Sequence, residues 1–242
     1  MTLTPYFNNQ NSSVRKLCAG CDQCNERSPL FHPLNRDELS LINKDRYSVR
    51  FHEGEVILKQ GTQATYYVSI VEGFAKIYIE GHLDRRLILD FVRPWKLVGG
   101  PGVYLNEKYR YSMVAVRETL VCFIQAENFK KVLALNSQFS DRFIILCSYN
   151  YSRALERMVG LSQKQMHGRI ADALIYLSEE IYGQSTIGAE ISRQDIADYT
   201  SMSKDSAIRI LKELERDAII HLEGHTIQIL DSRRLHDISV KG

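Results

Sequence analysis

Five cysteines carry the most reactive side chains of the chain, and three of them lie within seven residues. Cys18, Cys21 and Cys24 have the spacing C-x2-C-x2-C in a polar segment that contains a glycine. Thiolates at this spacing can bind a metal ion or an iron-sulfur centre, but both kinds of site normally need a fourth ligand. Cys122 and Cys147 are the other two thiols, so each is a candidate for completing the site.

The residues alone leave three states of this cysteine cluster open. An iron-sulfur centre and a zinc site both accept closely spaced cysteines, and unmetallated reactive thiols are the third alternative. Disulfides are disfavoured, because the polar N-terminal segment lacks the apolar core of a signal peptide. We therefore expect a cytoplasmic protein, in which thiols stay reduced. Cys147 is interpreted as a buried thiol of a helix.

Residues 191–220 indicate a second kind of chemistry, the recognition of DNA bases. At roughly 100° per residue, one polar face of a predicted helix contains Lys204, Asp205, Ile208, Arg209 and Lys212. Arginine pairs bidentately with guanine O6 and N7 in the major groove, so Arg209 is the candidate base contact. An isoleucine on a polar face gains nothing from contact with solvent, whereas it can pack against the methyl group of a thymine. Ile208 is therefore a second candidate for base contact.

Two short helices must hold these side chains. Ser192 and Asp195 have the spacing of an N-terminal capping box before the first helix. Residues 200–202 form the predicted turn, and Ser203 can cap the second helix. The core face of that helix is expected to contain Ser203, Ala207, Ile210, Leu211 and Leu214. Two alternating runs after residue 220 predict a β-hairpin wing.

The charge balance makes DNA binding depend on a local basic patch. Residues 161–242 contain 10 lysines and arginines against 13 acidic residues, so this part of the chain is not basic overall. The candidate patch consists of Arg193, Lys204, Arg209, Lys212, Arg233 and Arg234. Such a patch predicts salt-sensitive affinity, because each neutralised phosphate releases counterions. The negative balance also favours an alternative in which this part contacts a protein instead of DNA.

Short strands with glycine turns characterise residues 34–125. Alternating apolar and polar residues are interrupted by turns at Gly54, Gly61 and Gly73. Regularly spaced strands of this kind predict an antiparallel sandwich or barrel. With 242 residues, of which 44% are hydrophobic, the chain is long enough for two domains. No apolar run reaches the roughly 20 residues that span a membrane.

Helices are predicted from residue 126 onward, and the long helix at 137–159 has two alternative roles. Its apolar stripe contains Phe143, Cys147, Tyr151, Leu155 and Met158. This stripe either packs on the chain's own core or forms a seam with a second copy of the chain. A later amphipathic helix has the inward residues Ile170, Leu174 and Leu177. Residues 185–188 are interpreted as a turn, and residues 235–242 are expected to be partly loose.

No motif of a catalytic site is present in the chain. The sequence lacks a P-loop, a GxSxG elbow and an HExxH zinc motif, so we expect no enzyme. Seven histidines are scattered, and no spacing selects one of them as a haem ligand. His167 is interpreted as an ordinary surface residue.

The start Ser192-Arg193-Gln194, the predicted second helix and the immediate wing together resemble the cyclic-AMP receptor and fumarate-nitrate regulator (CRP/FNR) family. The residues that resemble the family's cyclic-nucleotide-type β-roll are Glu53-Gly54-Glu55, Val71-Glu72-Gly73 and Gly99. The resemblance implies an α+β fold with a β-roll (a double-stranded β-helix or jelly roll), a long dimerisation helix and a C-terminal winged helix-turn-helix. The implied parts are a cysteine-containing extension at 1–28, the roll at 29–136, the dimerisation helix at 137–160 and the DNA-binding domain at 161–242.

This resemblance implies a homodimeric transcription regulator that binds a pseudo-palindromic operator in double-stranded DNA. An activator of this type also contacts RNA polymerase, and no membrane partner is expected. In the family's pattern, Asp205 and Arg209 contact base edges, Lys204 assists, and Arg193 binds a phosphate. The full set of implied DNA contacts is Ser192, Arg193, Gln194, Ser203, Lys204, Asp205, Ile208, Arg209 and Lys212.

The cysteines are similar to those of the family's oxygen-sensing iron-sulfur branch. That similarity implies a 4Fe-4S cluster held by Cys18, Cys21, Cys24 and Cys122, which dissociates or converts when it is oxidised. Cys122 stands where the branch has its distal ligand. The alternative is a small-molecule, nitrosative or haem-based sensor without such a cluster.

Cyclic AMP is disfavoured as an effector. Binding members of the family carry a glutamate after the Gly99 position, and here Gly100-Pro101-Gly102 replaces that segment. Arg110 matches the family's phosphate-binding arginine only with a shift of register. A phosphodiester without a paired arginine leaves a buried charge uncompensated. The effector pocket therefore stays unassigned, with Gly100, Gly102 and Arg110 as its candidate residues.

Overall fold

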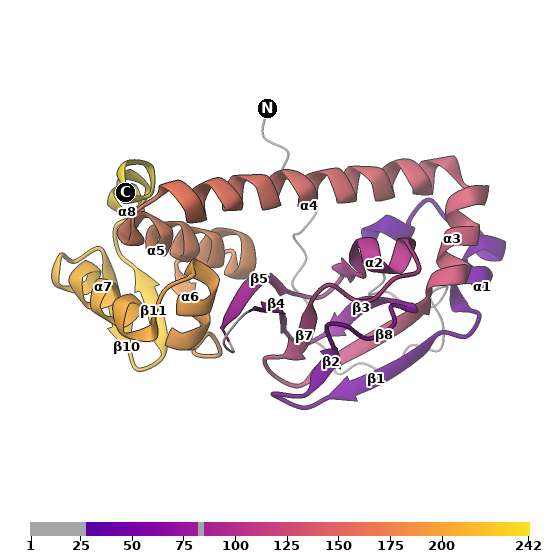
Figure 1. Ribbon diagram of the computed structural model, residues 1–242, viewed down its shortest axis with the longest axis horizontal. Helices are drawn as coiled ribbons and strands as arrows, with labels where there is room; N and C mark the ends of the chain where they lie inside the picture. The colour runs from indigo at the N-terminus through magenta and orange to yellow at the C-terminus, as the bar shows by residue number, and fades with distance from the viewer. Residues whose placement is uncertain (1–27, 82–84) are drawn as a thin grey trace.

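The computed structural model describes residues 28–81 and 85–242. Figure 1 shows two folded halves that lie along one long helix, α4 (Ser137–Gln163). The strands of the first half form a roll, and the second half is mainly helical and contains the C-terminus. This arrangement confirms the predicted α+β fold with a roll, a long helix and a C-terminal helix-turn-helix.

The roll consists of two antiparallel four-stranded sheets. The first contains, in spatial order, β1 (Tyr47–Phe51), β8 (Thr119–Gln125), β3 (Tyr66–Glu72) and β6 (Leu97–Val98). The second contains β2 (Val56–Leu58), β7 (Ser112–Ala115), β4 (Ala75–Glu80) and β5 (Arg86–Val92). β3 and β8 pair in the middle of the first sheet and are covered on both faces, which explains why most of their residues are apolar and buried.

Tight turns join these strands at the predicted glycines. Gly54, Gly61 and Gly73 have positive φ angles of 81°, 86° and 99°. At Gly73 a Cβ atom would lie 2.4 Å from the carbonyl oxygen of Glu118, so only glycine fits this turn.

Short helices close the ends of the roll and connect it to α4. They are the 3-10 helix η1 (Pro29–Phe31), α1 (Arg36–Asn43), α2 (Gly100–Tyr104) and α3 (Ala126–Leu135). The ring of Phe139, in the first turn of α4, packs 5.8 Å from Phe31 and 5.2 Å from Phe129 between ring centroids. This aromatic cluster is fully buried or nearly so, and it anchors the start of α4 to the core of the roll.

The C-terminal half contains the helix-turn-helix and a three-stranded wing sheet. Its elements are α5 (Met166–Ile175), the π-helical segment η3 (Tyr176–Tyr182), β9 (Thr186–Ile187), α6 (Arg193–Thr200), α7 (Lys204–Arg216), β10 (Ile220–Glu223), β11 (Thr226–Ile229) and α8 (Ser232–Lys241). The predicted inward residues Ile170, Leu174 and Leu177 are fully buried. β10 and β11 form the predicted hairpin.

Two segments of this half differ from the prediction. Residues 185–188, predicted as a turn, contain β9, which pairs with β11 as the third strand of the wing sheet. Of residues 235–242, expected to be partly loose, all but Gly242 belong to α8. This helix forms because the side chain of Asp231 caps its first turn and Leu235 is fully buried. α8 lies against α5.

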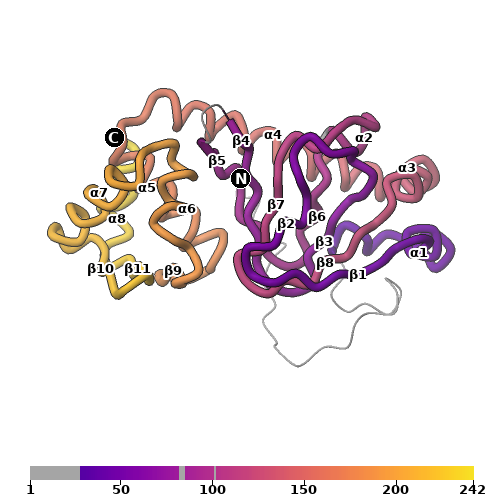
Figure 2. The backbone as a smooth tube through the Cα atoms, turned by 60° about the horizontal axis from the view of Figure 1, so that its bottom comes forward, coloured from indigo at the N-terminus to yellow at the C-terminus, as the bar shows by residue number. Residues whose placement is uncertain are grey.

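A hydrophobic core is shared between the two halves. The buried roll residues that belong to it are Phe74, Tyr78, Ile88, Phe91 and Val116, and they pack with buried residues of α5, η3, α6 and α7. β5 lies against α6, as Figure 2 shows, and the rings of Phe91 and Tyr199 are 5.7 Å apart. The position of the helix-turn-helix is therefore tied to the second sheet of the roll.

Candidate nucleic-acid interface

The ends of α6 and α7 are defined by the predicted caps. Ser192 Oγ accepts a hydrogen bond from the backbone N–H of Asp195 at 3.1 Å, and the Ser192 N–H donates to the Asp195 carboxylate at 3.0 Å. Ser201 in the turn has a φ of 54°, which ends α6. Ser203 Oγ then accepts from the N–H of Ser206 at 3.2 Å and starts α7. The chain therefore forms a helix-turn-helix at the predicted residues.

α7 has a buried face and an exposed polar face. The buried residues are Ala207, Ile210, Leu211 and Leu214, and the exposed ones are Lys204, Asp205, Arg209 and Lys212. Ile208 is half-buried at the edge of the polar face. Ser203, which we expected on the core face, is exposed because its side chain is engaged in capping the helix. α7 thus presents two lysines, an acid and an arginine on one accessible surface.

Arg193 connects α6 to the wing. Its guanidinium donates hydrogen bonds to the carbonyl oxygens of Gly224 at 3.2 Å and His225 at 3.3 Å. Burial lowers the pKa of Arg193. Gln194 is exposed, and its amide donates to Asp198 Oδ1 at 2.7 Å. Arg193 therefore holds the tip of the wing beside the start of α6, a contact that the sequence did not indicate.

An ion pair joins the helix-turn-helix to the roll. Lys76 of β4 contacts the carboxylate of Asp195, whose side chain is only 6% exposed. Arg93, just after β5, donates to the carbonyl oxygen of Ile181 in η3. Asp195 therefore has two functions, since it caps α6 and binds a cation of the roll.

Arg157 of α4 connects all three parts of the protein. Its guanidinium donates to the carbonyl oxygens of Ile88 and Leu89 in β5 and, at 2.7 Å, to that of Tyr199 in α6. The guanidinium carbon lies 3.8 Å from the centroid of the Tyr199 ring. Burial lowers the pKa of Arg157. These contacts form a clamp between the long helix, the roll and the helix-turn-helix.

A second polar cluster lies beside this clamp. The carboxylate of Asp90 contacts Lys96 and the hydroxyl of Tyr176. Burial alone would raise the pKa of Asp90, but the charge and hydrogen bonds of Lys96, with the Tyr176 hydroxyl, outweigh it and lower this pKa. Arg153 lies over the Tyr176 ring at 4.7 Å and pairs with Glu180 at 2.8 Å. Asp90 is therefore held as a carboxylate at the junction of the two halves.

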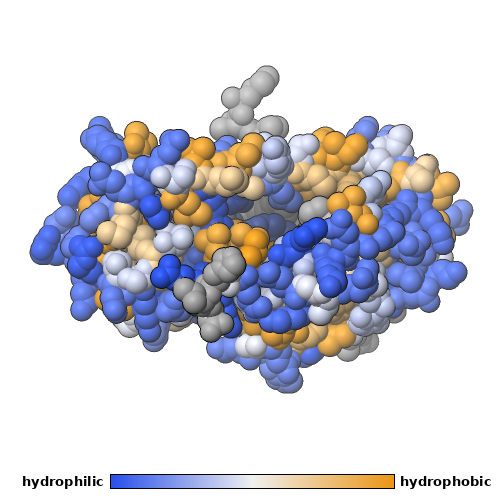
Figure 3. Space-filling model, in the orientation of Figure 1, coloured by the Kyte–Doolittle hydropathy of each residue, from blue (hydrophilic) through white to orange (hydrophobic). Residues whose placement is uncertain are grey.

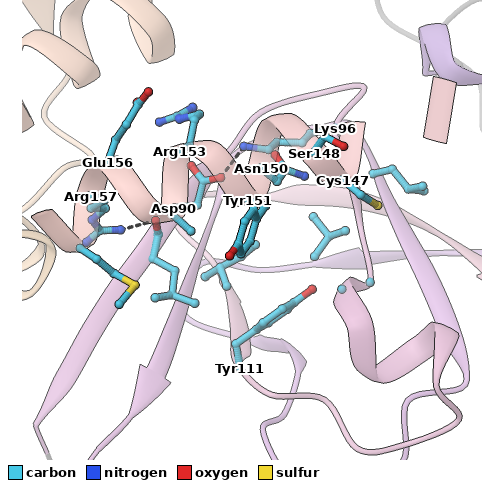
Figure 4. Close-up of a pocket in the computed structure, with 18 of the residues that line it drawn as sticks. Asp90, Lys96, Tyr111, Cys147, Ser148, Asn150, Tyr151, Arg153, Glu156 and Arg157 are labelled. Carbon is cyan, nitrogen blue, oxygen red and sulfur yellow. Dashed lines mark hydrogen bonds and ion pairs between the residues drawn. The ribbon is translucent and has the colours of Figure 1, made fainter. Parts of the chain in front are cut away.

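A groove of about 1420 Å³ opens at this junction, and Figure 4 shows residues that line it. It is bounded by strands β4, β5 and β6 and helices α2 and α3 of the roll, by α4, and by residues of α5, η3 and α6. Of the three candidate effector residues, Gly100 lines the groove. Arg110 lies elsewhere, where it is exposed and paired with Glu107, and a Cβ on Gly102 would lie 2.3 Å from the Lys108 carbonyl oxygen. Gly102 therefore allows the backbone at this position to lie close to the backbone of Lys108.

Of the four cysteines in the predicted cluster site, the structure describes Cys122. Cys18, Cys21 and Cys24 lie outside the described residues. Cys122 is in the middle of β8 and is 5% exposed, and Arg46 Nη1 donates to its Sγ at 3.1 Å. A hydrogen bond from a charged side chain to a cysteine sulfur is the kind of contact that orients a metal ligand.

Much of the apolar stripe of α4 is exposed in the single chain, where it lines the groove. Ile144, Tyr151 and Met158 recur every seven residues and are 60%, 66% and 65% exposed, whereas Phe143 packs against the core of the roll. Cys147, which we expected to be buried, is exposed and lines the groove. Figure 3 shows hydrophobic residues along the edge of the molecule that α4 occupies.

Although α4 is long, it has the composition of a surface helix. Among residues 28–81 and 85–242, no helix combines the length and the apolar character needed to cross a membrane.

Two models of protein families match the chain, and together they cover more than half of it. The description "Cyclic nucleotide-binding domain" matches residues 48–136, and "Crp-like helix-turn-helix domain" matches residues 168–238. These ranges correspond to the roll and to the helix-turn-helix with its wing.

Known proteins are similar to this chain along most of its length. The transcriptional activator protein FnrL of Cereibacter sphaeroides is 24% identical over 231 residues, which cover 91% of this chain and 86% of the relative. The nitrogen fixation regulation protein FixK of Bradyrhizobium diazoefficiens is 25% identical, with 90% and 93% covered. The solved structure of FixK2 from Bradyrhizobium japonicum shares the fold, with a TM-score of 0.74, 21% identity and coverage of 81% and 98%. The chain belongs to the CRP/FNR family of transcription regulators.

Proposed function

We propose that this protein is a homodimeric, sequence-specific DNA-binding transcription regulator that acts in the cytoplasm and has no enzymatic activity. The observation that carries the proposal is the exposed face of α7, where Lys204, Asp205, Arg209 and Lys212 project beside a wing. An α-helix fits the major groove, and these side-chain types pair with bases and phosphates there. If the regulator is an activator, it also contacts RNA polymerase.

The dimer is proposed to form through α4. Its exposed apolar residues Ile144, Tyr151 and Met158 have the seven-residue spacing of a two-helix seam. A two-fold axis along this seam places two copies of α7 on the same side of the dimer. Such a dimer binds half-sites about one helical turn apart, roughly 34 Å.

The clamp at Arg157 supports a route from sensing to DNA binding. Any change in the packing of α4, or a ligand in the groove, acts on Arg157 and through it on Tyr199 of α6. We propose that this change repositions the two recognition helices relative to successive major grooves. Coupling of this kind is typically about 1–3 kcal/mol.

Within this function, we propose a 4Fe-4S cluster as the first candidate for the sensing centre. The donor set fits, because the described ligand Cys122 is a shielded thiol next to a cationic donor, and the other ligands are Cys18, Cys21 and Cys24. Such a cluster, when bound, supplies a group that oxidation converts or releases. Arg46 would donate to the ligand sulfur. A zinc site, unmetallated thiols, or a small-molecule or haem-based sensor are the alternatives.

Anaerobically purified full-length protein is expected to contain iron and acid-labile sulfide. Cys122→Ser should lose most of both, because a serine oxygen is a poor replacement for a thiolate ligand. Cys147→Ser is the matched control and should retain them. Metal analysis and an absorption spectrum measure the outcome, and colourless, iron-free anaerobic wild-type protein contradicts the cluster.

Arg209→Ala is expected to weaken binding to the operator by about 1–3 kcal/mol and to blunt discrimination at one base pair. The reason is the loss of a bidentate contact with a base edge. The comparison variant Lys212→Ala should weaken binding to all duplexes alike and lower the salt dependence, since it removes a phosphate contact. Titrations of the operator and its single-base variants measure both effects. An equal loss for Arg209→Ala on every sequence argues against base contact by this residue.

A mobility-shift assay on the promoter of the protein's own gene tests the proposed function as a whole. We expect a shift that a specific competitor removes and a non-specific duplex does not. Absence of binding to any duplex favours the rival function, a signalling module whose acidic C-terminal half contacts a protein.

A further inference from the structure

One acidic residue on α7 contacts both the candidate base-reading arginine and a histidine of another helix. Glu213 Oε1 accepts a hydrogen bond from Arg209 Nη1 at 2.8 Å. Its other oxygen, Oε2, lies 2.7 Å from Nε2 of His167, in the first turn of α5. Both oxygens of the carboxylate are thus engaged, one by each partner.

We propose that Glu213 is a positioning residue for base recognition, which fixes the guanidinium of Arg209 for contact with a base and is itself fixed by His167. This inference rests on the proposed function, because it assumes that α7 enters the major groove. It assigns to Glu213 and His167 a share in sequence specificity, although neither was expected from the sequence to contribute.

The geometry explains how the carboxylate orients the arginine. Arg209 and Glu213 are four residues apart, so they lie on the same face of α7, one turn apart. The ion pair holds one nitrogen of the guanidinium, while the Arg209 side chain remains 54% exposed, so its other donors stay accessible. An arginine held in this way loses less freedom when it forms a bidentate contact with guanine.

His167 makes this arrangement more rigid than an ordinary surface ion pair. It belongs to α5, so Glu213 is tied to a part of the protein outside α6 and α7. The hydrogen bonds from His167 and Arg209 lower the pKa of Glu213, which keeps it a carboxylate near neutral pH. Without His167, the Glu213 side chain could follow Arg209 toward a phosphate.

The Glu213 carboxylate also disfavours contacts between Arg209 and DNA phosphates. A negative charge beside Arg209 reduces the attraction of this arginine to DNA phosphates, which supply most of non-specific binding. Contact with a guanine edge is affected less, because the bidentate hydrogen bonds compensate. Glu213 should therefore raise the ratio of specific to non-specific affinity.

The test is Glu213→Gln, titrated against duplexes that carry the selected operator and its single-base variants. Discrimination at the base pair that Arg209→Ala affects should fall at least about fivefold, the lower end of what one bidentate contact contributes. Discrimination at other positions should persist, and affinity for a random duplex should rise. The matched control is Asp217→Asn, which removes one charge from the other exposed ion pair at the end of α7. This control variant should raise the affinity for all duplexes without changing the ratio of specific to non-specific affinity.

Two further variants separate the possible failures. In an Arg209→Ala background, Glu213→Gln should change discrimination no further, and His167→Ala alone should reduce it at the same base pair. If Glu213→Gln does not fold, His167→Ala carries the test. If Arg209→Ala lowers discrimination but Glu213→Gln and His167→Ala leave it unchanged, the inference is overturned while the proposed function stands. If the wild-type protein prefers no sequence, the proposed function itself fails.

Discussion

A Tyr151→Glu, Met158→Glu double variant is expected to be monomeric and to bind the operator at least about 100-fold more weakly than the wild type. Both side chains are largely exposed in the single chain, so the substitutions should cost the folded monomer little. In the proposed dimer they lie on the seam, where each new carboxylate faces its own copy and is removed from water. A monomer contacts one half-site at a time and loses the high effective concentration of the second recognition helix.

Light scattering and an operator titration measure this prediction together. The control is Val240→Glu, which replaces another exposed apolar residue, 83% exposed on α8, and should leave the dimer intact. A double variant that remains dimeric contradicts the proposed seam. A monomeric variant with undiminished affinity contradicts the need for two recognition helices.

Arg157→Ala is expected to lower the free energy of unfolding by about 2–4 kcal/mol and to loosen the helix-turn-helix from the roll. The substitution removes the donor from three backbone carbonyls, those of Ile88, Leu89 and Tyr199, and the cation from the Tyr199 ring. Part of this surface is buried, so water replaces the lost hydrogen bonds incompletely. Arg157→Lys should recover little, because one ammonium group cannot reach all three oxygens in the geometry of a guanidinium.

Denaturant unfolding and limited proteolysis of the full chain measure the second prediction. We expect faster cleavage between α4 and α6 in both variants, because the clamp holds these elements together. Surface variants of α4, such as Glu156→Gln, should behave like the wild type. Unchanged unfolding and proteolysis in Arg157→Ala would mean that the clamp contributes little, and the proposed route from α4 to α6 would lose its physical basis.

The helix-turn-helix could be predicted from sequence because its signals are local. Ser192, Asp195 and Ser203 occupy cap positions, and each has its backbone partner three positions away in the sequence. The apolar period of α7 then assigns one face to the core, which leaves the polar face to solvent. The glycine turns of the roll have the same local character, since Gly54, Gly61 and Gly73 adopt the positive φ angles that glycine tolerates best.

The contacts between the two halves could not be predicted in this way. Lys76 and Asp195 are 119 residues apart, and no periodicity connects them. Arg157 has the sequence context of a solvated charge beside an apolar stripe, but its partners are backbone carbonyls, which leave no trace in the sequence. α8 was missed for a related reason, because besides its local cap at Asp231 its stability depends on burial of Leu235 against the rest of the fold.

The role inferred for Glu213 lies between these two cases. Its spacing to Arg209 is a local signal that the sequence contains, whereas its contact with His167 spans 46 residues and required the fold. A residue of this kind extends the candidate site from the side chains that touch DNA to those that hold them.

Selection of binding sites from a random pool of DNA duplexes tests the central claim most directly. If two copies of α7 contact successive major grooves, the enriched sequences should be inverted repeats with half-site centres about 10 base pairs apart. Arg209→Ala should enrich the same repeat with one position of each half-site relaxed. Enrichment of no sequence, or of a single site without two-fold symmetry, contradicts the account.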